Sequence, residues 1–316
     1  YHRGLLTRDV LAAVIVTLML VPQALAYAML AGLPPEMGLY ASMLPLVLYA
    51  IFGTSASLAV GPVAVAALMT ASALSSFAAP GSPEYIGAAL VLAALSGLIL
   101  IAMGVLRLGF LVNFLSHPVI SGFVTASGIL IAISQLKHIF GVEAPGHNVV
   151  ELLRALLGQW QQVNIITLLI GLGVWAYLWV CRKRLNGWLT ELGMPASWAG
   201  LMVKAAPISA VVVTTLLAWG FQLEQRGVDV VGFVPSGLPA MTLPSLDQSL
   251  WLGLLPAALL ISLVGFVESV SVAQTLAAKR RQRIDPNQEL IALGMANLGA
   301  GISGGSPVSG GFSRSV

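Results

Sequence analysis

The amino-acid sequence predicts an all-α polytopic membrane protein in which two of the membrane helices are interrupted by short extended segments. Of the 316 residues, 58% are hydrophobic and only 9% are charged, a balance outside the range of ordinary soluble domains. No charged residue falls within 10–35, 37–83 or 108–136, and each of these stretches can hold one or two membrane spans. Glycine, proline and serine gather at two points within apolar stretches, where a continuous helix is not expected.

The apolar stretches define nine membrane spans and the beginning of a tenth. They cover residues 9–31, 34–52, 61–79, 84–106, 118–140, 163–181, 200–220, 250–275 and 287–303, and the tenth starts near Pro307. A signal peptide does not explain this pattern, because apolar segments recur along the whole chain. We therefore expect the lipid bilayer to be the main partner of the folded chain.

Basic residues indicate orientation in the membrane rather than nucleic-acid binding. The formal net charge is +3, but Lys and Arg lie mainly in short loops between apolar segments. If the N-terminus is cytoplasmic, ten of the fifteen basic residues fall on the cytoplasmic side. We expect a multi-pass protein of a cell membrane, the inner membrane if the source is bacterial, with a cytoplasmic N-terminus and no nucleic-acid partner.

The sequence indicates no metal site and no enzyme. Cys181 is the single cysteine, so the chain can form neither an internal disulfide framework nor a cysteine-based metal site. His117, His138 and His147 lie at span edges or in a loop and lack the spacing of metal ligands. No span contains a cluster of nucleophiles and bases, and so we expect no catalytic residues and no cofactor beyond a coupling ion.

Two long connections between spans are expected on the outer side of the membrane. Residues 141–162 contain an amphipathic stretch at 149–157, which predicts a helix lying at the membrane interface. Residues 221–247 are rich in glycine and proline and include a β-like run at 228–232. Neither connection holds a plausible catalytic constellation.

The helical pattern is broken at three places within the spans. Pro22 precedes Gln23 in the middle of the first span, where a proline predicts a kink or an interruption. The third span opens with the short polar and β-branched residues of 54–62, and the tenth opens with the Gly- and Ser-rich run 304–315. Both openings predict an extended strand that turns into a half-helix, which is tolerated in a membrane only where it is buried or lines a cavity.

Two half-helices that begin inside the membrane predict an anion site. The first backbone N–H groups of each half-helix lack partners and carry partial positive charge. If the third and tenth spans are equivalent members of an inverted repeat, their N-termini face each other near the midplane. Arg314, at the start of the tenth half-helix, adds a positive charge there. The alternative for Arg314 is a charge that packs helices or anchors a loop.

Polar side chains on two other spans are candidates for the same site. We take Glu268 as the only acid inside a predicted span, where apolar surroundings would let it load and release a proton during transport. The alternative is a permanently paired carboxylate, with Lys204 as one partner. Gln23 and Tyr27 are four residues apart, share a helix face, and could offer an amide and a ring to the site. Ordinary interhelical hydrogen bonding is their alternative role.

Several motifs resemble the sulfate permease (SulP) family of solute carrier family 26. The resemblance covers nearly the whole chain and rests on the following segments: 21–35, 38–40, 53–55, Gly61-Pro62, 116–123, 235–239 and 310–315.

The resemblance implies an anion transporter of the uracil-permease-like fold, with seven-plus-seven inverted repeats split into core and gate domains. Residues 1–249 would then form the first repeat and 250–316 the start of the second. Family members form homodimers and move the core domain as an elevator. By position, the anion pocket would involve these residues: Gln23, Tyr27, Val63, Ala64, Gly311, Phe312, Ser313 and Arg314.

The resemblance also bears on coupling. Sodium-coupled bicarbonate members carry an Asp in the eighth span followed four residues later by Thr. Here those positions hold Glu268 and Val272, which makes Na⁺ coupling less expected than H⁺ coupling or anion exchange. The sequence stops at Val316, inside the tenth span, so we expect the last four helices and a cytoplasmic STAS domain to belong to a longer protein.

The expected cargo is a small inorganic or carboxylic anion, with sulfate the leading candidate over bicarbonate, chloride and dicarboxylates. Two other functions stay open at this point. A channel-like anion conductor would use the same residues without coupling. A nucleobase–cation symporter would share the fold, but it would be expected to carry acidic or amide side chains where this chain has Ser313 and Arg314.

Overall fold

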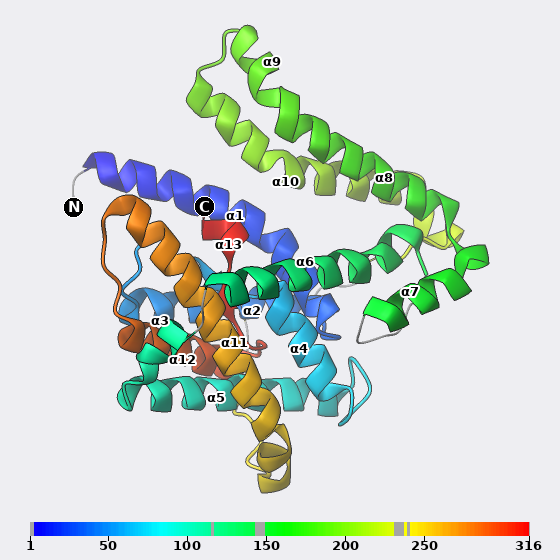
Figure 1. The fold of residues 1–316 in the computed structure, drawn as a ribbon. Coiled ribbons are helices and arrows are strands. Elements are labelled where there is room, and N and C mark those ends of the chain that lie inside the picture. Colours follow the sequence, from blue (N-terminus) through cyan, green and yellow to red (C-terminus); the bar gives the residue numbers. More distant parts are fainter. Residues whose placement is uncertain (1–2, 115–116, 143–148, 231–236, 239–240, 316) are drawn as a thin grey trace. The chain divides into compact units, whose positions relative to one another are not determined.

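The computed structural model describes residues 3–114, 117–142, 149–230, 237–238 and 241–315, and these are mostly helical (Figure 1). The first half contains α1 (Arg3–Leu30), α2 (Pro35–Tyr40), α3 (Leu44–Phe52), β1 (Val60–Gly61), α4 (Ala64–Leu74), α5 (Pro83–Val105), the 3₁₀ helix η1 (Leu108–Phe114), α6 (His117–Phe140) and α7 (Val149–Gly158).

The second half contains η2 (Trp160–Gln162), α8 (Ile165–Val180), a π-helical turn η3 (Cys181–Leu185), α9 (Asn186–Glu191), α10 (Ala196–Gly220), η4 (Leu223–Arg226), α11 (Gln248–Arg280), α12 (Pro286–Ile302), β2 (Ser309–Gly310) and α13 (Phe312–Ser315).

The chain divides into two compact units, each made of separate stretches of sequence. Unit 1 comprises residues 1–22 and 128–232, and unit 2 comprises residues 23–127 and 233–316. Within α1 the boundary falls between Pro22 and Gln23, where the sequence predicts a kink or an interruption. The helix runs through Pro22 without interruption, so that part of the prediction is wrong, and the kink stays a prediction.

Several helices begin where the sequence supplies a capping side chain. Ser82 accepts a hydrogen bond from Tyr85 N at 3.2 Å, and Pro83 occupies the first helical position of α5. Asp285 accepts from Asn287 N at 2.9 Å at the start of α12. These side chains satisfy N–H groups that the helix itself leaves unpaired.

Small residues let α5 and α12 pack closely in unit 2. A Cβ atom added to Gly97 would lie 2.8 Å from Gly294 O, and a Cβ added to Gly294 would lie 2.8 Å from Gly97 O. Glycine at these two positions therefore allows the two backbones to approach, as is common between membrane helices. The buried core around this contact includes Leu100, Phe266 and Leu290.

Two short strands lie side by side in unit 2, and their paired residues are called the strand crossing below. β1 and β2 pair antiparallel, with Val60 opposite Gly310 and Gly61 opposite Ser309. Each strand leads within three residues into a helix, β1 into α4 and β2 into α13. The predicted pair of strands turning into helices is therefore confirmed.

The predicted spans agree with the helices, with two corrections. The second span is divided into α2 and α3 by a turn at 41–43, where Ser42 Oγ donates to Gly38 O at 2.8 Å. The β-like run at 228–232 forms no strand in its described residues 228–230, and 231–232 lie outside the described residues. Gly227, which precedes this run, has a φ of 77°, so the chain is not extended there. A short extended segment is also not stable without a partner strand. The helix predicted at 149–157 is confirmed as α7.

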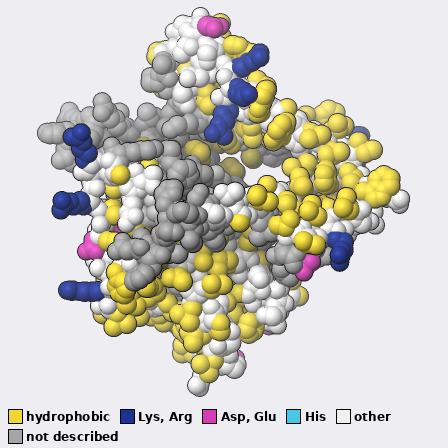
Figure 2. Space-filling model, in the orientation of Figure 1, with side chains coloured by type: hydrophobic (Ala, Val, Ile, Leu, Met, Phe, Trp, Pro, Cys, Tyr) yellow, Lys and Arg dark blue, Asp and Glu magenta, His cyan; other side chains and the backbone are white. Residues whose placement is uncertain are grey.

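Five of the described helical segments are long and apolar enough to cross a membrane: Ala12–Leu30, Pro35–Phe52, Pro83–Val105, Ile165–Glu191 and Gln248–Ala278. Many apolar side chains on these helices are exposed, among them Leu169 at 65% and Leu252 at 62%. Figure 2 shows hydrophobic side chains over much of the visible described surface. Such exposure would be unfavourable in water and suits contact with lipid, and so the chain is a multi-pass membrane protein.

Candidate functional site

The crossing of β1 and β2 places the start of α4 inside unit 2. Val63 is extended, with φ −133° and ψ 150°, and no side chain caps the helix that begins at Ala64. Val63 is 6% exposed and Ala64 is 8% exposed. The first N–H groups of a helix have no partner within it, so this buried end of an eleven-residue helix presents partial positive charge.

Arg314 lies against the same crossing. A Cβ atom added to Gly61 would lie 3.1 Å from Arg314 Nη1, and one added to Gly311 would lie 2.8 Å from Nη2. The guanidinium therefore lies against Gly61, the last residue of β1, and Gly311, which follows β2, and a methyl group at either position would require it to shift. Arg314 is 6% exposed, and its Nη1 and Nη2 atoms have no hydrogen-bond partner among the described residues.

Glu268 and Tyr27 reach the surroundings of Arg314 from α11 and α1. Arg314 interacts electrostatically with both Glu268 and Tyr27. Glu268 Oε2 is buried without a hydrogen-bond partner among the described residues, as is Gln23 Oε1. A buried polar atom without a partner costs free energy, and several at one place are typical of a site that a ligand or water completes.

Serine side chains fasten the crossing to α11. Ser269 Oγ lies 3.0 Å from Ser309 Oγ and accepts a hydrogen bond from Gly310 N at 2.8 Å. At the other side, Gly311 N donates to Ala59 O at 3.0 Å, and Ala59 N donates to Ser315 Oγ at 2.9 Å. The backbone polar groups at this crossing are therefore largely satisfied, while Nη1 and Nη2 of the nearby Arg314 have no hydrogen bond to a described residue.

The structure brings most of the predicted site residues together in unit 2. Gln23 and Tyr27 lie on α1, Val63 and Ala64 lie at the start of α4, and Glu268 lies on α11. Gly311 and Arg314 lie on and beside α13, at the end of β2.

Three predictions about this site fall partly outside the described structure. Phe312 and Ser313 belong to α13, but their side chains lie outside the described part of the structure. The side chain of Lys204 also lies outside the described part of the structure, so a pairing of Lys204 with Glu268 stays a prediction.

One expectation about buried acids is wrong. Glu268 is not the only acid inside a span, because Glu289 lies within α12 and is 0% exposed. The sequence contained the signal, since Glu289 falls inside the predicted span 287–303. Proximity to the start of that span makes an acid look like a solvated residue of the helix end. The sequence also gives no signal for the roles of Ser269, Ser309 and Asn297, because short polar residues are common between membrane helices.

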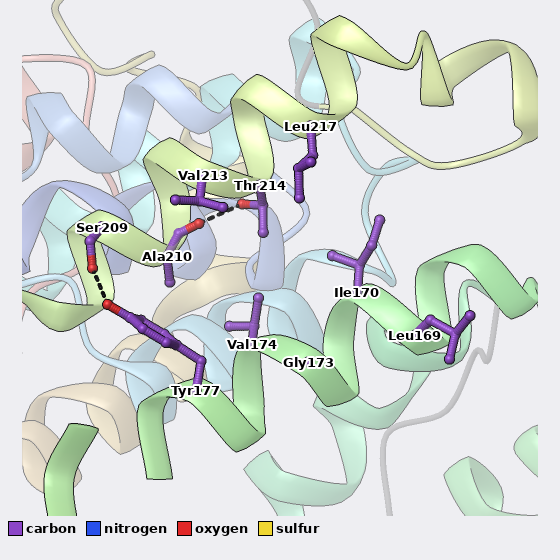
Figure 3. Close-up of a pocket in the computed structure, with 10 residues that line it drawn as sticks. All are labelled: Leu169, Ile170, Gly173, Val174, Tyr177, Ser209, Ala210, Val213, Thr214 and Leu217. Atoms are coloured by element: carbon purple, nitrogen blue, oxygen red, sulfur yellow. Dashed lines mark hydrogen bonds between the residues drawn. The ribbon is translucent and has the colours of Figure 1, made fainter. Parts of the chain in front are cut away.

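A cavity lies in unit 1, between α8 and α10 (Figure 3). It has a volume of about 440 Å³ and is lined by Leu169, Ile170, Gly173, Val174, Tyr177, Ser209, Ala210, Val213, Thr214 and Leu217. Its hydroxyl groups are already bonded: Tyr177 Oη lies 2.6 Å from Ser209 Oγ, and Thr214 Oγ1 donates to Ala210 O at 2.9 Å. None of the described residues that line this cavity is charged, and so they provide no counter-charge for an anion.

The chain matches known proteins along its length. Residues 6–316 match the model of the sulfate permease family. The chain is 39% identical over 316 residues to sulfate transporter 4.1, chloroplastic, of Arabidopsis thaliana, with 98% of this chain and 44% of that protein covered. It is 36% identical over 316 residues to the probable sulfate transporter MT1781 of Mycobacterium tuberculosis, with 100% and 54% covered.

A solved structure shares the fold. The overall structure of SLC26A9 matches with a TM-score of 0.86 and 26% sequence identity, covering 98% of this chain and 50% of that one. The fold is thus the expected uracil-permease-like one. The chain spans about half the length of the curated relatives that it matches.

Proposed function

Since this chain belongs to the sulfate permease family, a family of membrane transporters and not of enzymes, we propose that it carries the anion-binding part of a secondary transporter. The proposed cargo is a small anion, with sulfate first because curated relatives are named as sulfate transporters. Bicarbonate, chloride and dicarboxylates are the other candidates.

The observation that carries this proposal is the buried guanidinium of Arg314 and its two terminal nitrogens. It is 6% exposed, with Nη1 and Nη2 unbonded among the described residues. A buried charge without a partner costs about 3–5 kcal/mol, and Arg314 is in that state when the neighbouring Glu268 is protonated. An anion seated between this guanidinium and the first N–H groups of α4 would remove that cost. A neutral substrate would not.

Glu268 gives the proposal a route to proton coupling. While Glu268 is ionised, its charge offsets that of Arg314, and the site as a whole gains little from an anion. When Glu268 takes up a proton, the positive charge of Arg314 is no longer offset, and an anion becomes the favoured counter-charge. Proton and anion would then bind together and leave together. No Asp–Thr pair occupies 268 and 272, so Na⁺ is the less favoured coupling ion.

The two compact units supply a division of labour for transport. Unit 2 contains the strand crossing and every candidate site residue, and we assign it to the moving core domain. Unit 1 contains α8 and α10 and would belong to the gate. Movement of the core as an elevator, assembly as a homodimer and the grouping into repeats at 1–249 and 250–316 are parts of this proposal.

Uptake of labelled sulfate into proteoliposomes that contain the complete protein tests the function. Unlabelled sulfate, bicarbonate, chloride, a dicarboxylate and uracil are added in turn, with and without imposed proton and sodium gradients. We expect competition by anions, none by uracil, and stimulation by an inward proton gradient. Competition by uracil would favour a nucleobase symporter, and anion currents without coupled uptake would favour a channel.

A further inference from the structure

The first turns of α12 hold the segment that leads into β1. Glu289, which is 0% exposed, receives four hydrogen bonds from this region. Tyr49 Oη donates to its Oε2 at 2.6 Å. Thr54 Oγ1, Thr54 N and Ser55 N donate to its Oε1 at 2.5, 2.8 and 3.0 Å. A carboxylate buried in this way is stabilised by its donors, and the donors are fixed in turn by it.

Neighbouring residues of α12 strengthen the same attachment. Gln288 Nε2 donates to Phe52 O at 2.7 Å, and Asp285 N donates to Thr54 Oγ1 at 3.3 Å. The end of α3 and the residues after it are thus tied to one turn of α12. Val60, the first residue of β1, follows Ser55 by only five positions.

The same helix holds the segment that leads into β2. Asn297 Nδ2 donates to Val308 O at 2.9 Å, and its Oδ1 accepts from Val308 N at 3.0 Å. The side-chain amide thus pairs with the main chain of Val308 as a neighbouring strand would. Asn297 is 2% exposed, and Ser309, the first residue of β2, comes directly after Val308.

We propose that α12 sets the register of both strands and that Glu289 and Asn297 are positioning residues for the anion site. Glu289 fixes the approach to β1 and therefore the start of α4. Asn297 fixes β2 and therefore Gly311 and Arg314. One rigid helix would hold both halves of the site in mutual alignment.

Glu289 and Glu268 differ in a way that supports this assignment. Four donors already point at the two oxygens of Glu289, whereas Glu268 Oε2 has none among the described residues. The carboxylate of Glu289 is therefore fully engaged by the residues that lead into β1. Glu268 is left available for exchange with a proton or a substrate.

The test compares two tyrosine variants of the complete protein. Tyr49→Phe removes the hydroxyl that donates to Glu289. Tyr85→Phe is the matched control, because Tyr85 Oη donates to Ala31 O at 2.7 Å, a buried bond that involves neither strand. Glu289→Ala and Asn297→Ala remove each attachment entirely.

Hydrogen exchange measured by mass spectrometry reports strand positioning without any reference to transport. Glu289→Ala should speed exchange in 54–61 by about tenfold, and Asn297→Ala should do so in 308–311, because an unmet buried hydrogen bond weakens local order. Tyr49→Phe should speed exchange in 54–61 by about threefold, and Tyr85→Phe should leave both segments unchanged.

Sulfate affinity is the second readout, and this part of the inference rests on the proposed function. The affinity of Glu289→Ala should fall by about tenfold and that of Tyr49→Phe by about threefold, with Tyr85→Phe unchanged. If Glu289→Ala does not fold, Glu289→Gln and Tyr49→Phe decide the matter.

Two results separate failure of this inference from failure of the proposed function. Unchanged exchange in 54–61 for both Glu289→Ala and Tyr49→Phe would overturn the positioning role, as would equal loss of affinity in Tyr49→Phe and Tyr85→Phe. A wild-type protein that binds no anion would refute the proposed function, and the exchange data would still decide whether α12 positions the strands.

Discussion

The strand crossing of unit 2 and the cavity between α8 and α10 of unit 1, called the groove below, differ in whether their polar side chains have hydrogen-bond partners. At the crossing, Arg314 and Glu268 are largely buried, and Nη1, Nη2 and Oε2 have no hydrogen-bond partner among the described residues. In the groove between α8 and α10, the hydroxyl of Tyr177 is bonded to that of Ser209, and the remaining lining is mainly apolar.

This difference shows that the volume of a cavity is a poor guide to where an anion binds in this protein. The groove has a volume of about 440 Å³, but its lining would interact equally well with any hydrocarbon. The crossing holds charged side chains whose Nη1, Nη2 and Oε2 atoms have no hydrogen-bond partner among the described residues, and such groups in a membrane are rarely kept without a role. Variants in the two regions should therefore differ sharply in their effect on transport.

The largest effect is expected from Arg314→Ala. Loss of the guanidinium removes the charge-assisted bonds to the anion, and sulfate uptake at subsaturating concentration should fall by about 100-fold. Uptake into proteoliposomes checks this, with Arg182→Ala as the control because Arg182 is exposed in unit 1. Unchanged uptake and affinity in Arg314→Ala would contradict the role of this residue.

Glu268→Gln should change the coupling rather than the fold. The amide cannot take up or release a proton, so uptake should no longer respond to an imposed proton gradient. The comparison is uptake with and without the gradient, and Glu84→Gln serves as a control because Glu84 lies exposed in the first turn of α5. A Glu268→Gln protein still driven by the gradient would show that protons are coupled elsewhere.

Gly311→Ala tests the position of the guanidinium. The new methyl group would lie 2.8 Å from Arg314 Nη2 and 2.9 Å from Nε, so the flexible end of the side chain must shift. We expect about a tenfold loss of sulfate affinity with the protein still folded. Gly87→Ala is the matched control, because no heavy atom outside its own helix backbone and chain neighbours lies within 4 Å of a Cβ at Gly87. Equal affinities in the two variants would separate Gly311 from the site.

The smallest effect is expected in the groove. Tyr177→Phe removes one hydroxyl pair at an exposed position, which should cost less than about 1 kcal/mol of stability. Sulfate uptake should stay within about twofold of the wild type, since no charge is altered. Thermal unfolding and uptake assays check the two statements, and a large loss of uptake would place part of the anion path in unit 1.

Much of the fold follows from the sequence because membrane helices depend on local properties. The length of the apolar stretches predicted α5, α8, α11 and α12 to within about five residues, since a membrane-spanning backbone must satisfy its hydrogen bonds internally as a helix. Gly-Pro and Gly-Ser runs likewise predicted β1 and β2, because clusters of such residues favour an extended or turning backbone over a continuous helix.

The parts of the site that the sequence did not predict depend on contacts between residues that are not neighbours in the sequence. Glu289 is separated from Tyr49 by 240 positions, and Asn297 bonds a main chain that local patterns treat as a simple loop. Neither pairing leaves a periodic signal. The prediction of a β-like segment is wrong at 228–230 for a related reason. A strand needs a partner strand, and the sequence of a single segment does not show whether it has one.

Equilibrium binding of labelled sulfate to the complete, purified protein tests the central claim most directly. Wild type, Arg314→Ala and Tyr177→Phe are measured side by side under the same ionic conditions. The account predicts saturable binding to wild type and to Tyr177→Phe with equal affinity, and binding weakened by about 100-fold in Arg314→Ala. Equal binding by Arg314→Ala and the wild type would contradict it.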